Sequence, residues 1–99
     1  MAHQITVEEF EKGNAVRYRV TVVDGGGRTQ HIVSVETSYR DRLVGEKIAA
    51  EHLVAKSFEF LLEREPKESI LRQFDLRAIS RYFPEYEKEI RRTFGVSSE

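Results

Sequence analysis

The sequence predicts a single α+β domain over residues 1–99, in which a three-stranded antiparallel meander precedes a long helix and two to three short C-terminal helices. Two observations predict it: apolar and polar residues alternate through the first third, and apolar residues recur at helical spacing afterwards. Three strands with one apolar face are not stable alone, so we expect the helices to pack on one sheet face. The expected order is strands within residues 3–37, helices within residues 39–94 and a frayed tail over residues 95–99.

The three expected strands lie near residues 3–10, 16–22 and 30–37. The second alternates most regularly, with apolar even positions and polar odd positions, so one face should be buried. Turns are expected at residues 12–14 and 24–28, where Gly and Asn tolerate positive φ. The loop at 24–28 joins two strands and no Lys-Ser/Thr pair follows it, which favours a hairpin turn over a phosphate cradle.

The long helix is expected over residues 46–65, which contain few helix breakers. Its apolar residues form one stripe for packing on the sheet: Ala50, Val54, Phe58, Leu61 and Leu62. Pro66 stops this helix or occupies the first turn of the next. Because Gly45 interrupts the pattern, residues 39–44 either belong to the long helix or form a separate turn.

The C-terminal third predicts short helices. One is expected through Ile70 and Leu71, and a second over residues 76–83 with Asp75 as its N-cap. Pro84 then begins a last helix that carries apolar residues at i, i+4 and i+8 and ends at a glycine, as helices commonly do: Tyr86, Ile90, Phe94 and Gly95.

Composition excludes several kinds of site. The chain has no cysteine, and 16 basic residues against 17 acidic ones give a net charge of −1. Its three histidines lack metal-binding spacing, and no nucleophile motif is present: His3, His31 and His52. We therefore expect no metal, no cofactor and no enzyme activity. No apolar run approaches the roughly 18 residues of a membrane span and no signal-peptide pattern begins the chain, so we expect a cytoplasmic protein that does not bind membranes.

The long helix carries a second apolar patch opposite its main stripe, formed by Ala49, Leu53 and Phe60. Either the C-terminal helices cover this patch, or it is exposed and docks a partner or a second copy of the chain. The leading hypothesis is a non-enzymatic protein-interaction module, with self-association as one form of the interaction. Its expected docking residues, chosen because aromatic side chains are favoured in interface hot spots, are Leu53, Phe60, Tyr82 and Tyr86.

Nucleic-acid binding is the alternative hypothesis. Arginines alternate with aromatic residues in the C-terminal third, as in proteins that bind single strands. The basic candidates are Arg72, Arg77, Arg81, Lys88, Arg91 and Arg92. However, residues 39–99 hold as many acidic as basic residues, and a nucleic-acid-binding domain normally has a basic excess.

Three stretches carry a resemblance to a known family: FEFLLEREP at residues 58–66, ILRQFDL at residues 70–76 and YFPEY at residues 82–86. Over residues 30–90 the chain resembles a family of small bacterial proteins of unknown function. The resemblance implies a bacterial cytoplasmic origin. It implies no activity and no site residues.

Overall fold

The computed structural model describes residues 3–96 and contains a four-stranded sheet of order β1-β2-β3-β4. Strands β1 (Gln4–Glu11), β2 (Ala15–Asp24) and β3 (Gly27–Glu36) are antiparallel neighbours, as the sequence predicts. The β2–β3 hairpin turns at Gly27, whose φ of 127° favours glycine. The side chain of Asp24 accepts a hydrogen bond of 2.8 Å from the amide of Gly26, so the Gly-rich loop is a hairpin turn.

The fourth strand, β4 (Gln73–Asp75), corrects the prediction of a three-stranded antiparallel sheet. It pairs with β3 in parallel, and Val33 lies opposite Phe74. The amide of Ile32 donates a 2.8 Å hydrogen bond to the carbonyl of Arg72, just before the strand. Parallel neighbours need a long crossover connection, and here the chain from residue 37 to residue 72 supplies it. A strand of three residues is too short to show alternation, which is why the sequence does not reveal it.

Two helices replace the single long one. Helix α1 (Thr37–Val44) follows β3 directly and ends at Gly45, whose φ is 91°. Helix α2 (Ala50–Leu62) begins only after a connection over residues 45–49, so it is shorter than the expected helix over residues 46–65. Residues 39–44 therefore belong to a separate helix, which resolves the alternative that Gly45 leaves open.

The C-terminal part is less helical than expected. The 3₁₀ turn η1 (Lys67–Ser69) follows Pro66, and the chain is extended at Ile70 instead of helical. The N-cap prediction for Asp75 is confirmed, because its side chain accepts from the amide of Arg77 at 3.0 Å. The elements that follow Asp75 are η2 (Leu76–Ala78), α3 (Ile79–Tyr82) and α4 (Tyr86–Phe94).

Helix α4 ends as the sequence predicts. Gly95 has a left-handed φ of 69°. Its amide donates to the carbonyl of Arg92 at 3.1 Å, and the amide of Val96 donates to that of Arg91 at 2.8 Å. These two bonds form a Schellman cap, which satisfies carbonyls at the helix end. The rest of the expected frayed tail, residues 97–99, lies outside the described residues.

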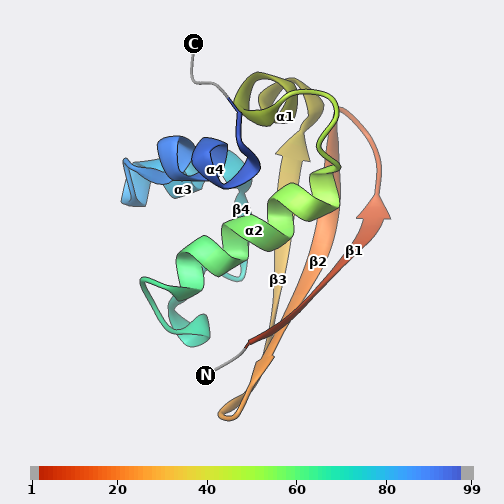
Figure 1. Ribbon diagram of the computed structural model, residues 1–99. Helices are drawn as coiled ribbons and strands as arrows, with labels where there is room; N and C mark the ends of the chain where they lie inside the picture. The colour runs from red at the N-terminus through yellow and green to blue at the C-terminus, as the bar shows by residue number, and fades with distance from the viewer. Residues whose placement is uncertain (1–2, 97–99) are drawn as a thin grey trace.

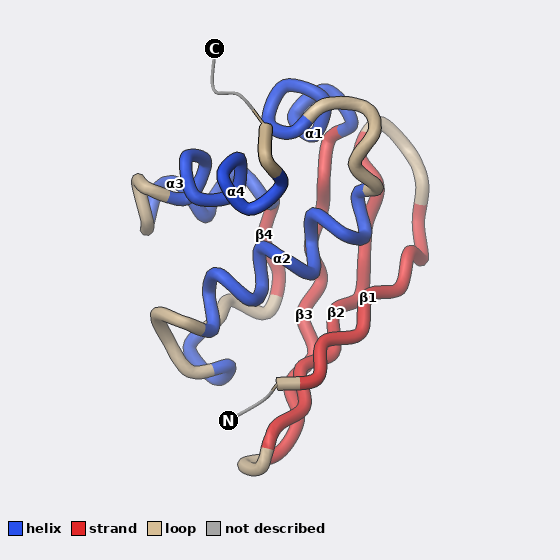
Figure 2. The backbone as a smooth tube through the Cα atoms, in the orientation of Figure 1, coloured by secondary structure: helices blue, strands red, loops and turns tan. Residues whose placement is uncertain are grey.

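The core lies between the sheet and α2, which crosses the inner face of the strands, while α3 and α4 lie beside it (Figure 1). The tube view shows β4 beside β3 on the side of these short helices (Figure 2). Tyr18, Val20 and Val22 of β2 are buried on the inner face. The outer face is polar, where Arg17 pairs with Glu11 at 2.9 Å. Helices therefore cover one face of the sheet, and water covers the other.

Candidate functional site

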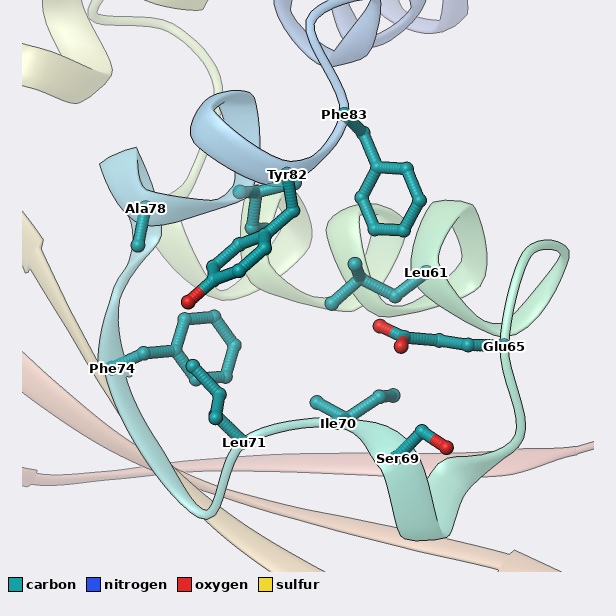
Figure 3. A pocket seen from close by; sticks show the side chains of 10 residues that line it. Leu61, Glu65, Ser69, Ile70, Leu71, Phe74, Ala78, Tyr82 and Phe83 are labelled. Carbon is teal, nitrogen blue, oxygen red and sulfur yellow. The ribbon is translucent and has the colours of Figure 1, made fainter.

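An apolar pocket of about 160 Å³ opens between the end of α2, the segment that leads into β4, and the η2–α3 turn (Figure 3). Three aromatic rings and five aliphatic side chains form most of its wall. Its lining residues are Leu61, Glu65, Ser69, Ile70, Leu71, Phe74, Ala78, Ile79, Tyr82 and Phe83. Glu65 is the only charged residue among them, so the pocket combines an apolar wall with one carboxylate.

Residues 70–74, which we call the rim segment, form one side of the pocket. Because side chains of an extended chain point to alternate sides, Ile70 faces inward and is buried, whereas Leu71 faces outward and is 49% exposed. The segment is held from behind: the carbonyl of Leu71 accepts a 2.8 Å hydrogen bond from His31 Nδ1. A fixed backbone thus presents Leu71 at the pocket mouth.

Tyr82 of α3 also lies on the rim of the pocket. Its side chain is 65% exposed, and its ring lies near that of Phe74 (Figure 3). The exposed large hydrophobic residues among residues 3–96 are Phe10, Val23, Leu71 and Tyr82. Two of these four lie on the rim of the same pocket, and contiguous exposed apolar surface of this kind marks binding sites.

The carboxylate of Glu65 points into the pocket between Leu61 and Ile70 (Figure 3). The side chain is half-buried, and burial raises its pKa above the usual value for a glutamate. Among residues 3–96 no donor or cation lies within hydrogen-bonding or ion-pairing distance of it, and burial is the sole cause of its pKa shift. The carboxylate therefore has unused capacity to accept hydrogen bonds in apolar surroundings.

The cations on either side of Glu65 in the sequence are already engaged. Arg64 bonds to Glu85 through Nε at 3.1 Å, and its guanidinium lies 3.6 Å from the centre of the Phe60 ring. Lys67 is 3% exposed and its Nζ contacts Asp24 at 2.7 Å and Glu68 at 2.8 Å. The hydrogen bonds to Asp24 and Glu68 raise the pKa of Lys67. Neither cation is placed to neutralise Glu65.

Three of the four expected docking residues are in the core, which corrects the expectation of an exposed patch. Leu53 and Tyr86 are 0% exposed and Phe60 is 6% exposed. The ring of Phe60 packs edge-on against Phe83 and Tyr86, with centroids 5.9 and 5.3 Å apart. The Tyr86 hydroxyl is hydrogen-bonded to Ser57 Oγ at 2.7 Å. The C-terminal helices thus cover the second apolar face of α2, and only Tyr82 of the four is on the surface.

The basic candidates do not form one unopposed surface. Arg77 pairs with Glu36 at 2.9 Å, and Arg92 pairs with Glu89 at 3.2 Å. The Nε of Arg91 donates to the carbonyl of Leu43 at the end of α1. The remaining candidates have exposed side chains: Arg72, Arg81 and Lys88. Half of the set is thus already used within the fold, and nucleic-acid binding stays a prediction.

The three histidines lie in different surroundings. His31 is buried between Thr29 and the rim segment, His52 packs edge-on against Phe94, and His3 lies 3.6 Å from Asp24. Within residues 3–96, no group of three His, Cys, Asp or Glu side chains is arranged to hold a metal ion. None of the helices in this part of the chain is long and apolar enough to cross a membrane.

Sequence reasoning did not single out Glu65 or Leu71, although each leaves a signal. Glu65 lies four residues after Leu61, so in the helix expected over residues 46–65 it falls on the apolar stripe, where a hydrophobic residue would be expected. Leu71 follows Ile70, and two consecutive apolar residues in an extended segment must face opposite sides. The exposure of Leu71 can be inferred from its neighbour Ile70 only when the segment is known to be extended.

Comparison of the chain with protein-family models, with curated proteins and with solved structures gave no match. The resemblance carried by the FEFLLEREP, ILRQFDL and YFPEY stretches, with the bacterial cytoplasmic origin that it implies, stays a prediction. The pocket geometry is therefore the ground on which a function is proposed.

Proposed function

We propose that this protein is a non-enzymatic protein-interaction module that binds one side chain of a partner protein in the pocket that Leu71 and Tyr82 line. The observation that carries the proposal is the position of these two exposed apolar side chains at one hollow. Aromatic and aliphatic anchors around a pocket are typical of the energetic centre of protein interfaces.

The size of the pocket supports a side chain as the occupant. Sites for drug-sized ligands and cofactors usually enclose about 300–1,000 Å³, whereas this pocket holds about 160 Å³. An apolar cavity of roughly 150 Å³ accommodates a benzene-sized group. The volume therefore suits one amino-acid side chain better than a nucleotide or an organic cofactor.

The test is the selection of short random peptides displayed on phage against the immobilised protein, followed by affinity measurements on the selected peptides. Leu71→Ser removes the apolar side chain from the rim without adding a charge or altering the core. Val23→Ser is the matched control, because Val23 is an exposed apolar residue of β2 that does not line the pocket. We expect the peptides to bind the wild type and Val23→Ser equally, and to bind Leu71→Ser at least about tenfold more weakly.

Equal binding to Leu71→Ser and the wild type would contradict the proposal. Light scattering after size-exclusion chromatography adds a second readout for the same three proteins. If the wild type is a dimer that Leu71→Ser dissociates and Val23→Ser preserves, the occupant is a second copy of this chain instead of a partner protein.

A further inference from the structure

We propose that the pocket selects an aliphatic ammonium group, presented as a lysine side chain of the partner, with its stem on the apolar wall and its charged end at Glu65. This inference rests on the proposed function and adds the chemistry of the occupant. It uses three features of the described residues: a small apolar pocket, one carboxylate that points into it, and neighbouring cations that are already paired with other carboxylates.

The apolar wall fits the stem of a lysine. The pocket of about 160 Å³ is lined by Leu61, Ile70 and Ile79 on the inside and by Leu71 at its mouth. Lysine side chains commonly lay their methylene stems along apolar surface while the charged end finds a polar partner. Burying each methylene group is worth about 0.8 kcal/mol, so the stem contributes to binding independently of the charge.

The carboxylate of Glu65 fits the charged end. It is half-buried and no donor among residues 3–96 contacts it. A carboxylate that loses water without gaining a partner is unfavourable, and a cation restores the lost interaction. Hydrogen bonds between an ammonium and a carboxylate are also stronger than neutral ones. An anionic or neutral occupant would leave the carboxylate without this compensation.

Residues 3–96 do not supply the cation themselves. Arg64 and Lys67 are the basic residues nearest to Glu65 in the sequence, and both are held by other carboxylates. The ammonium of Lys67 has two carboxylate partners and is nearly inaccessible. Because both cations are bound to other carboxylates, residues 3–96 offer Glu65 no cationic partner, and a bound molecule can provide one.

Aromatic rings add to the preference for a cation. Phe74, Tyr82 and Phe83 line the pocket, and Figure 3 shows the rings of Tyr82 and Phe74 on one side and that of Phe83 on the other. Aromatic faces attract ammonium groups through their quadrupoles. The carboxylate and the rings therefore favour the same class of occupant.

The experiment is an NMR titration of the ¹⁵N-labelled protein at neutral pH with n-butylammonium, which mimics the lysine side chain, and with n-butanol as its neutral analogue. Shifts are followed at the amides of Leu71, Phe74 and Tyr82. We expect n-butylammonium to bind the wild type with a Kd on the order of 1 mM, as suits so small a ligand. We expect n-butanol to bind about tenfold more weakly.

Two variants identify the source of the preference. Glu65→Gln keeps the size of the side chain and removes its charge, so the two probes should bind this variant equally. Glu63→Gln is the matched control, since Glu63 is an exposed carboxylate close by that does not line the pocket. It should keep the wild-type preference. Thermal unfolding of both variants confirms that each is folded.

The outcomes separate the two proposals. If both probes bind the wild type equally, or if Glu65→Gln keeps the preference for n-butylammonium, the selection of an ammonium group is wrong while the pocket remains a binding site. If neither probe shifts the three amides and no peptide is selected, the proposed function itself fails.

A last comparison distinguishes a lysine side chain from a free amine. Short peptides with one lysine flanked by leucines are measured beside the same peptides with norleucine in its place. We expect the lysine peptides to bind more tightly than n-butylammonium and than the norleucine peptides. Tighter binding of n-butylammonium than of every lysine peptide would make a small free amine the occupant and overturn the assignment to a partner protein.

Discussion

Two ionisable side chains lie on opposite sides of the rim segment, and the fold treats them differently. Behind it, His31 is fully buried and both ring nitrogens are bonded, Nδ1 to the carbonyl of Leu71 at 2.8 Å and Nε2 to Thr29 Oγ1 at 2.9 Å. In front of it, Glu65 is half-buried and has no bonded partner among residues 3–96.

This difference indicates that His31 stabilises the fold, whereas Glu65 is free to bind another group. A buried polar group whose hydrogen bonds are all made holds its surroundings in one arrangement. Because Leu71 offers only a carbonyl oxygen, the proton of neutral His31 lies on Nδ1, and Thr29 donates to Nε2. A half-buried carboxylate without a donor holds nothing in place. We therefore expect changes on the inner side of the rim segment to affect stability, and the proposed binding involves its outer side.

The largest expected difference is between Phe58→Ala and Leu71→Ala. The ring of Phe58 is fully buried, and its centroid lies 5.3 Å from that of the His31 ring and 6.0 Å from that of the Phe74 ring. Its removal therefore leaves a cavity behind the rim segment. We expect a loss of about 3–5 kcal/mol in the free energy of unfolding. Leu71→Ala should cost only about 0.5 kcal/mol, because the side chain is exposed. Urea denaturation measures both, and similar losses would erase the distinction between the two sides.

The next expected effect is the dependence of stability on pH through His31. Burial lowers the pKa of its imidazole, and the nearby positive charge of Arg72 lowers it further against the opposing effect of its bond to Leu71. The unfolded chain therefore binds a proton more readily than the folded one. The contribution of His31 to the free energy of unfolding should be constant above about pH 7. It should fall as the pH drops through 6.5 towards the lower pKa of the folded state, by at most about 1.4 kcal/mol per pH unit.

Urea denaturation at a series of pH values between 5 and 8 measures this slope. His31→Gln should be less stable at pH 8, because it loses part of the bonding of the ring, and should show a flatter pH profile. The other two histidines, His3 and His52, remain in the variant and serve as the internal control. An unchanged profile in His31→Gln would show that another group carries the pH dependence.

The smallest expected effect is that of Glu65→Gln on stability. Because burial raises the pKa of Glu65, the charged carboxylate is disfavoured by folding at neutral pH. Glu65→Gln should therefore be as stable as the wild type or more stable by up to about 0.5 kcal/mol. As the pH falls through the folded pKa the carboxylate gains a proton, so the difference should disappear below about pH 4.5. A clear loss of stability at pH 7 would mean that Glu65 has a structural role.

Much of the fold could be predicted from local patterns. The first three strands follow from alternation and glycine turns, and the last helix follows from its apolar spacing and from Gly95. Asp75 is the N-cap that its side chain and position predict. These features depend on residues close together in the sequence, where steric preferences and local hydrogen bonds decide the conformation.

The prediction of the docking surface was wrong for a reason that is not local. A hydrophobic face on a helix shows that something covers it, without showing whether the cover belongs to the same chain. Here Phe83 and Tyr86 cover Phe60, and a bond between Ser57 and Tyr86 completes the contact. The exposed apolar residues are instead those at the ends of short elements, such as Leu71 and Tyr82.

The sequence by itself determined the α+β class, the antiparallel strands and their turns, and the last helix with its cap, because each depends on neighbouring residues. Only the tertiary structure decided that β4 joins the sheet in parallel, that the second face of α2 is covered, and that Glu65 faces a hollow without a partner. These three features arise from contacts between segments far apart in the chain, such as His31 with Leu71, and no local pattern encodes them.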